Sequence, residues 1–210
     1  MPLTSLDTIG ERIRTNLEAK NSARDQALHR SRELIRLCAN AIRASHRNEF
    51  AEAGELLIQA RSAASTMIAD LDGYPDLYHA GYTQDALKEY AEASITSALI
   101  QGRELPEPEG LGVEYAAYLN GMGEAAGELR RYALDALRRS DLETAEAMLA
   151  AMDAIYDLLV TIDYPDALTG GLRRTTDMVR GVLERTRGDL TVAARQQRLE
   201  EALKSVENRI

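Results

Sequence analysis

The stretch TSLDTIGERIRTNLEAKNSARDQALHRSRELIRLCANAIRA, residues 4–44, decides the fold. Its apolar side chains recur with the period of a helix, and no proline occurs between Pro2 and Pro75. Proline inside a helix removes a backbone hydrogen bond and clashes with the preceding turn, so its absence leaves the helix free to continue. The stretch therefore predicts one very long first helix.

The rest of the chain reads as helices separated by short breaks. The 210 residues include five prolines, one phenylalanine and no tryptophan, and no segment alternates as a strand would. Proline and glycine occur together in three segments that we expect to separate helices: DGYP (72–75), GRELPEPEG (102–110) and DYPDALTGG (163–171). We expect an all-α fold, with residues 1–210 forming a single domain and a second long helix running from Leu172 almost to the C-terminus.

Two helix starts carry capping residues. Asn48 is a plausible N-cap for EFAEAGELLIQARSAASTMIADL, because its side chain can accept a bond from an amide of the first turn. SDLE, residues 140–143, has the spacing of a capping box, with Ser140 as the N-cap.

The net charge and the distribution of apolar residues limit the kinds of partner that the protein can bind. The net charge of −9 gives no general attraction to nucleic acid or anionic membrane, so any site for a polyanion must be a local patch. No apolar segment is long enough to span a bilayer, and the N-terminus does not resemble a signal peptide. Cys38 is the only cysteine, which fits a reducing compartment. We expect a soluble, cytoplasmic protein.

Two pairs of carboxylates stand out against small and apolar neighbours. Glu89 and Glu92 lie three apart in ALKEYAEASI (86–95), and the helix becomes almost wholly apolar or small just after them. They form a solvated face, or they are buried and need a partner, a raised pKa or a metal. Glu124 and Glu128 share a helix face within GMGEAAGEL (121–129). The glycines there allow another backbone or a ligand to come close, or Glu128 simply pairs with Arg131 or another base.

Taken together, the four carboxylates suit a hard cation such as Mg²⁺ or Mn²⁺. A di-iron bundle would need two Glu-x-x-His motifs besides two further glutamates. None of the three histidines follows a glutamate at that spacing, which excludes this class of site.

A basic stripe lies on the first helix. On a helical wheel an arc of roughly 80° holds His29, Arg32, Arg36, Asn40, Arg43 and Arg47. Arginine binds phosphate oxygens through a planar fork, so the stripe is either a site for a nucleic-acid backbone or a solvated face. His46 lies off the stripe and reads as an ordinary surface histidine.

Several segments resemble the translin superfamily, specifically translin-associated factor X and its archaeal relatives. SRELIRLCANAIRASHRNEFAEA resembles the end of the first helix and its turn, and LKEYAEA and GEAAGELRR resemble the two acidic signatures. LVTIDYPDALTGGLRRTTDMVRGVLERTRGDLT resembles the tail of the archaeal branch. Glu124 departs from the pattern, because the catalytic subunits of eukaryotes have an aspartate there.

The resemblance implies a bundle of about seven helices that assembles into a closed homo-octameric barrel with RNA inside. It implies an endoribonuclease dependent on Mg²⁺ or Mn²⁺, in which Glu89, Glu92, Glu124 and Glu128 are catalytic metal ligands. RNA, single-stranded or as a short duplex, is the expected partner, and the basic stripe (His29, Arg32, Arg36, Arg43 and Arg47) would hold it. A binding protein for RNA or single-stranded DNA without catalysis is the alternative, and a helical scaffold is the third reading.

Overall fold

The computed structural model describes residues 3–207, and this part of the chain holds nine helices and no strand. Six helices are long: α1 (Leu3–His46), α2 (Phe50–Asp70), α4 (Gly81–Ile100), α6 (Tyr115–Arg138), α7 (Leu142–Leu159) and α9 (Leu172–Glu207). Three span a single turn: α3 (Pro75–Tyr78), α5 (Pro108–Leu111) and α8 (Asp166–Thr169). The all-α prediction is confirmed, as are the long first and last helices. None of the described helices is both long and apolar enough to cross a membrane.

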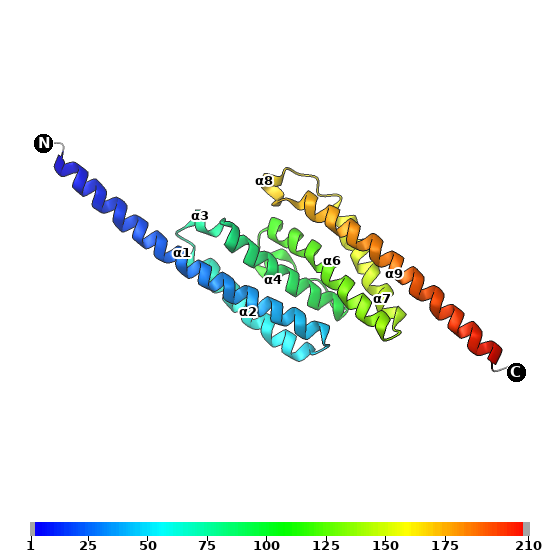
Figure 1. Cartoon of the computed structure of the whole chain (residues 1–210). Coiled ribbons are helices and arrows are strands. Elements are labelled where there is room, and N and C mark those ends of the chain that lie inside the picture. Colours follow the sequence, from blue (N-terminus) through cyan, green and yellow to red (C-terminus); the bar gives the residue numbers. More distant parts are fainter. Residues whose placement is uncertain (1–2, 208–210) are drawn as a thin grey trace.

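Helices α4 and α6 lie side by side at the centre of the bundle (Figure 1). On one side α1 packs against α4 and α2 packs against α1, whereas on the other side α7 and α9 pack against α6 (Figure 1). One cluster of buried residues runs through all of these contacts, from Ala27 in α1 to Leu190 in α9. Because α4 is covered by helices on both sides, twelve of its residues from Thr83 to Ala98 are buried.

The two terminal helices extend beyond the bundle at opposite ends of the molecule (Figure 1). None of residues 5–26 in α1 or 191–207 in α9 is buried. Both projecting parts nevertheless carry large apolar side chains that are exposed: Leu6, Ile9, Ile13 and Leu17 in α1, and Val192, Leu199, Leu203 and Val206 in α9.

Both predicted N-caps are wrong by one residue, for the same reason. Asn48 (φ 61°) and Ser140 (φ 60°) adopt left-handed conformations that close the preceding helices α1 and α6. The next amide then reaches back five residues, from Glu49 to the carbonyl of Ala44 and from Asp141 to that of Ala136. The cap of α7 is consequently Asp141, whose side chain accepts a hydrogen bond from the Thr144 amide at 3.0 Å.

Gly121 sets the close approach of α4 and α6. A Cβ atom at this position would lie 2.6 Å from the carbonyl oxygen of Lys88, which is backbone and cannot turn aside. At Gly123 a Cβ would meet the side chain of Thr175 in α9. At Gly127 it would meet nothing within 4 Å. The expectation that another backbone comes close is therefore confirmed for Gly121, and packing gives no reason for glycine at 127.

Candidate metal centre

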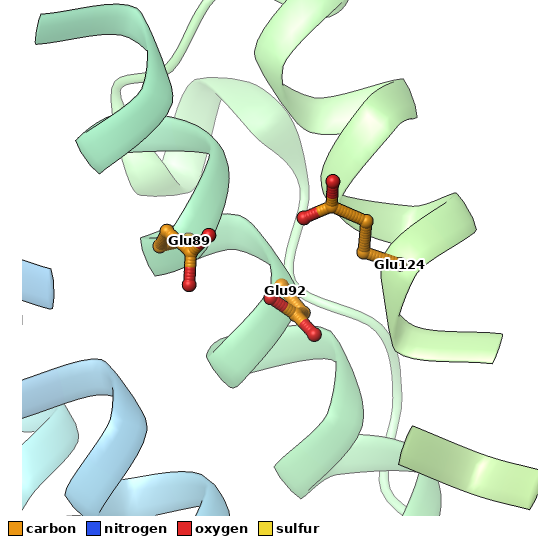
Figure 2. A group of neighbouring side chains, drawn as sticks. All are labelled: Glu89, Glu92 and Glu124. Carbon is orange, nitrogen blue, oxygen red and sulfur yellow. The ribbon is translucent and has the colours of Figure 1, made fainter. Parts of the chain in front are cut away.

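Three of the four predicted carboxylates meet where α4 faces α6. One oxygen from each of Glu89, Glu92 and Glu124 can be chosen so that all lie within 4.8 Å of one another. Figure 2 shows Glu89 and Glu92 on α4 with Glu124 on the facing helix. We call these three residues the acid cluster. Its geometry follows from the spacing of Glu89 and Glu92 on one helix and from the close approach that Gly121 permits.

Glu92 lies deepest in the cluster, with only 8% of its surface exposed. Burial raises the pKa of Glu92 to about 8, and the charges of Glu89, Glu124 and Glu128 contribute in the same direction. The pKa of the half-buried Glu89 is also raised, first by burial, although the charge of Lys88 opposes this effect. The reading of this helix side as a solvated face is therefore wrong for Glu92.

Lys88 lies between two members of the cluster. Its ammonium nitrogen is 2.7 Å from Oε1 of Glu124 and 3.8 Å from Oε1 of Glu89. Burial acts to lower the pKa of Lys88, but the hydrogen bond to Glu124 and the neighbouring carboxylates outweigh burial and raise it. Lys88 is therefore a cation held within a group of acids.

The fourth predicted carboxylate, Glu128, is engaged differently. Its Oε2 lies 2.5 Å from Nε2 of His46, at the C-terminal end of α1, and 3.9 Å from the guanidinium of Arg131. The hydrogen bond from His46 lowers the pKa of Glu128. Glu128 does pair with a base, and its charge still reaches Glu92. It lies at the edge of the acid cluster, outside the three residues whose oxygens meet.

His46 is the residue that the sequence reasoning missed. Only 5% of its side chain is exposed, so the reading as a surface histidine is wrong. Its Nδ1 atom is buried and has no hydrogen-bond partner. The signal available in the sequence was its spacing, because His46 lies off the exposed stripe and one helical turn after the buried Ile42.

Helix α1 runs beside the acid cluster. The pKa of the buried Cys38 thiol is raised, first by burial and then by the charges of Glu89 and Glu92. His29, Arg32, Arg36, Arg43 and Arg47 are all exposed, as a stripe along the surface of α1 requires. Among the described residues no ion pair involves Arg32 or Arg36, whereas Arg47 pairs with Glu49 and Glu52. Arg43 donates to the side chain of Asn40 at 2.5 Å.

A groove of about 920 Å³ opens beside the cluster. Lys88 and Glu124 form its edge toward the acid cluster, and residues of α8 and the start of α9, including Arg174 and Thr175, line the other side. The groove thus gives access from the surface to Lys88 and Glu124, whereas Glu92 is buried.

The donor set fits a hard divalent cation. Carboxylate oxygens are the protein ligands that Mg²⁺ and Mn²⁺ prefer. A carboxyl group whose pKa is raised by burial and by neighbouring like charges is stabilised in its ionised form when a cation joins it. Glu89, Glu92 and Glu124 would hold the ion, and Glu128 could join them through Oε1, because His46 contacts only Oε2.

Comparison with known proteins gives three solved structures of the same fold. The chain superposes on AfC3PO with a TM-score of 0.82 and 36% identity, over 88% of this chain and 96% of that one. It matches AfC3PO in complex with duplex RNA with a TM-score of 0.77 and 35% identity, over 88% and 95% of the two chains. NeC3PO in its apo form gives a TM-score of 0.80 at 23% identity, over 87% and 96%, which shows the fold alone.

Among proteins compared by sequence, an uncharacterized protein of Methanocaldococcus jannaschii is 29% identical over 192 residues, which are 91% of this chain and 85% of the relative. No protein-family model matches the chain. The similarity to AfC3PO extends over almost the whole of that protein. The chain belongs to the translin superfamily, among the proteins that resemble translin-associated factor X.

Proposed function

We propose that this protein is an endoribonuclease dependent on Mg²⁺ or Mn²⁺. The observation that carries the proposal is the acid cluster, in which oxygens of Glu89, Glu92 and Glu124 lie within 4.8 Å of one another. The similarity to AfC3PO, a protein solved with duplex RNA, supports RNA as the substrate. An ion bound there would activate a water molecule and stabilise the negative charge that develops on the phosphate.

The chain's own residues would supply the rest of the site. The exposed arginines of the stripe would bind the phosphate backbone. Arg32 and Arg36 would be the most available, because Arg47 pairs with Glu49 and Glu52 and Arg43 is bonded to Asn40. Contacts to phosphate carry no base information, so binding would depend on salt and hardly on sequence. The net charge of −9 makes this local patch necessary.

We further propose that the protein acts as a homo-oligomer, an octameric barrel with RNA inside. The projecting ends of α1 and α9 support self-association, because each exposes apolar side chains at helical spacing. Leu6, Ile13 and Leu17 are each more than half exposed, as are Leu199 and Leu203. Apolar stripes of this kind are stabilised when another helix covers them. Light scattering would give a mass of eight times the 23.2 kDa chain, and Ile13→Glu with Leu17→Glu should reduce it.

A protein that binds RNA or single-stranded DNA without cleaving it is the second candidate. One observation favours it: the Lys88 ammonium group already compensates Glu124, so this carboxylate has a partner without any metal. The arginine stripe would serve such a protein equally well.

The proposal is tested by incubating the protein with labelled RNA, single-stranded or as a short duplex, once with Mg²⁺ and once with EDTA. We expect cleavage only with Mg²⁺, and its loss in Glu89→Gln, in which the amide keeps the shape of the side chain but cannot supply a charged oxygen. Glu146→Gln, at an exposed position on α7, is the matched control and should cleave as the wild type does. Cleavage that persists in EDTA or in Glu89→Gln would rule out the acid cluster as the active site. RNA bound without cleavage under every condition would support the second candidate.

A further inference from the structure

Lys88 is a cation built into the acid cluster. Its ammonium group contacts Glu124 on the facing helix at 2.7 Å and approaches Glu89, one residue along the chain, at 3.8 Å. Only 21% of the side chain is exposed. Within residues 5–207 no other lysine or arginine forms an ion pair with Glu89, Glu92 or Glu124.

The position of Lys88 is fixed by its backbone. The carbonyl of Lys88 packs against Gly121, where even a Cβ atom would come within 2.6 Å of it. The residue therefore cannot move far from α6, and its side chain emerges beside Glu124. Because only 21% of the side chain is exposed, pairing costs Lys88 less side-chain freedom than it costs a lysine on a free surface.

From this geometry we infer that the Lys88 ammonium group takes the place of a second divalent cation, so that the cluster binds one ion. The inference rests on the proposed metal site. In two-metal sites the ions lie ~3.5–4 Å apart and share carboxylates between them. Lys88 likewise serves two carboxylates of the cluster, because its ammonium nitrogen lies 2.7 Å from Oε1 of Glu124 and 3.8 Å from Oε1 of Glu89.

Charge balance agrees with this reading. The three carboxylates of the cluster, when ionised, are balanced by one ammonium group and one divalent ion. A second divalent ion would leave an excess of positive charge in a half-buried site, which is costly.

Titration of the metal-free, full-length protein with MnCl₂ tests the inference, by calorimetry for stoichiometry and by electron paramagnetic resonance for coupling between ions. We expect one Mn²⁺ per chain in the wild type, with an uncoupled spectrum. Lys88→Met keeps an unbranched side chain and removes the charge, and should bind two ions per chain with the spectrum of a spin-coupled pair. Lys88→Arg restores a cation and should return the number of Mn²⁺ ions bound per chain to one.

Lys20→Met is the matched control, because Lys20 pairs with Asp76 away from the cluster, and it should bind one ion. Circular dichroism checks that each variant is folded, and Lys88→Gln replaces Lys88→Met should the latter not fold. Two ions in the wild type, or one ion in the wild type and in the neutral Lys88 variants alike, would overturn the inference and leave the metal site standing. No bound ion in any variant would overturn the metal site and the inference together.

Discussion

His46 Nε2 lies 2.5 Å from Oε2 of Glu128, and this contact joins the end of α1 to the middle of α6. The ring of His46 lies near the ring of Tyr132, and their centroids are 6.1 Å apart. The hydroxyl of Tyr132 in turn donates to the side chain of Asn48 at 2.6 Å. The turn after α1 is thereby tied to the helix that carries Glu124 and Glu128, which fixes the direction of the Glu128 carboxylate.

The first prediction concerns this contact. His46→Leu should leave Glu128 without its donor, so the pKa of Glu128 rises and the carboxylate is free to turn. Loss of a group that orients a ligand typically weakens metal binding ~10–100-fold. We expect a loss of that size in Mn²⁺ affinity, measured by calorimetry. His46→Gln places an amide N–H at a similar distance along the side chain and should recover part of the affinity. Unchanged affinity in His46→Leu would show that Glu128 is not a ligand that His46 orients.

The second prediction follows from the raised pKa of Glu92. Its pKa is about 8 in the folded protein, against an ordinary value near 4.5. Between these values the folded state holds a proton that the unfolded state has released, so stability falls as pH rises through this window. The full shift in pKa corresponds to a change of at most about 5 kcal/mol in the free energy of unfolding. Urea unfolding in EDTA should therefore show Glu92→Gln gaining several kcal/mol over the wild type at pH 8 and little at pH 5.

The affinity for metal should change with pH in the opposite direction to the stability of the metal-free protein. Because an ion binds the ionised carboxylate, Mn²⁺ affinity should rise with pH up to about 8, with close to one proton released per ion at pH 7. Calorimetry in two buffers of different ionisation enthalpy measures that proton. Equal pH dependence of stability in the wild type and Glu92→Gln would mean that Glu92 is ionised in the folded protein at neutral pH.

The third prediction compares two glycines of α6. Gly121→Ala places a Cβ 2.6 Å from a backbone carbonyl and must push α4 and α6 apart, which we expect to cost ~1–3 kcal/mol. Gly127→Ala meets no atom within 4 Å and should gain ~0.5–1 kcal/mol from helix propensity. Urea unfolding of both variants measures the difference. A Gly121→Ala protein as stable as Gly127→Ala would show that the helices separate freely.

The sequence predicts the helices and the pairing of Glu89 with Glu92, because both depend on local spacing. Glu89 and Glu92 share a helix face through their separation of three residues, and proline and glycine mark the breaks. The contacts of Glu128 with His46, 82 residues away, and of Lys88 with Glu124, 36 residues away, depend on how α1, α4 and α6 pack. No periodicity within one helix carries that information. Helix ends were misplaced at Asn48 and Ser140 because a residue that favours a cap can equally adopt the left-handed conformation that ends the helix before it.

The last prediction tests the stripe on α1 through its dependence on salt. Each arginine that contacts a phosphate releases counterions, so removing one should reduce the slope of log affinity against log salt by up to about one unit on a duplex. Arg36→Gln with Arg43→Gln, both exposed, should bind duplex RNA more weakly at low salt, with a slope shallower by up to about two units and no change in base preference. The matched control is Arg180→Gln with Arg185→Gln, two exposed arginines on α9, which does not pack against α1. Equal slopes in the wild type, the double variant and the control would exclude the stripe as the path of the RNA, and the groove beside Arg174 would be the next surface to examine.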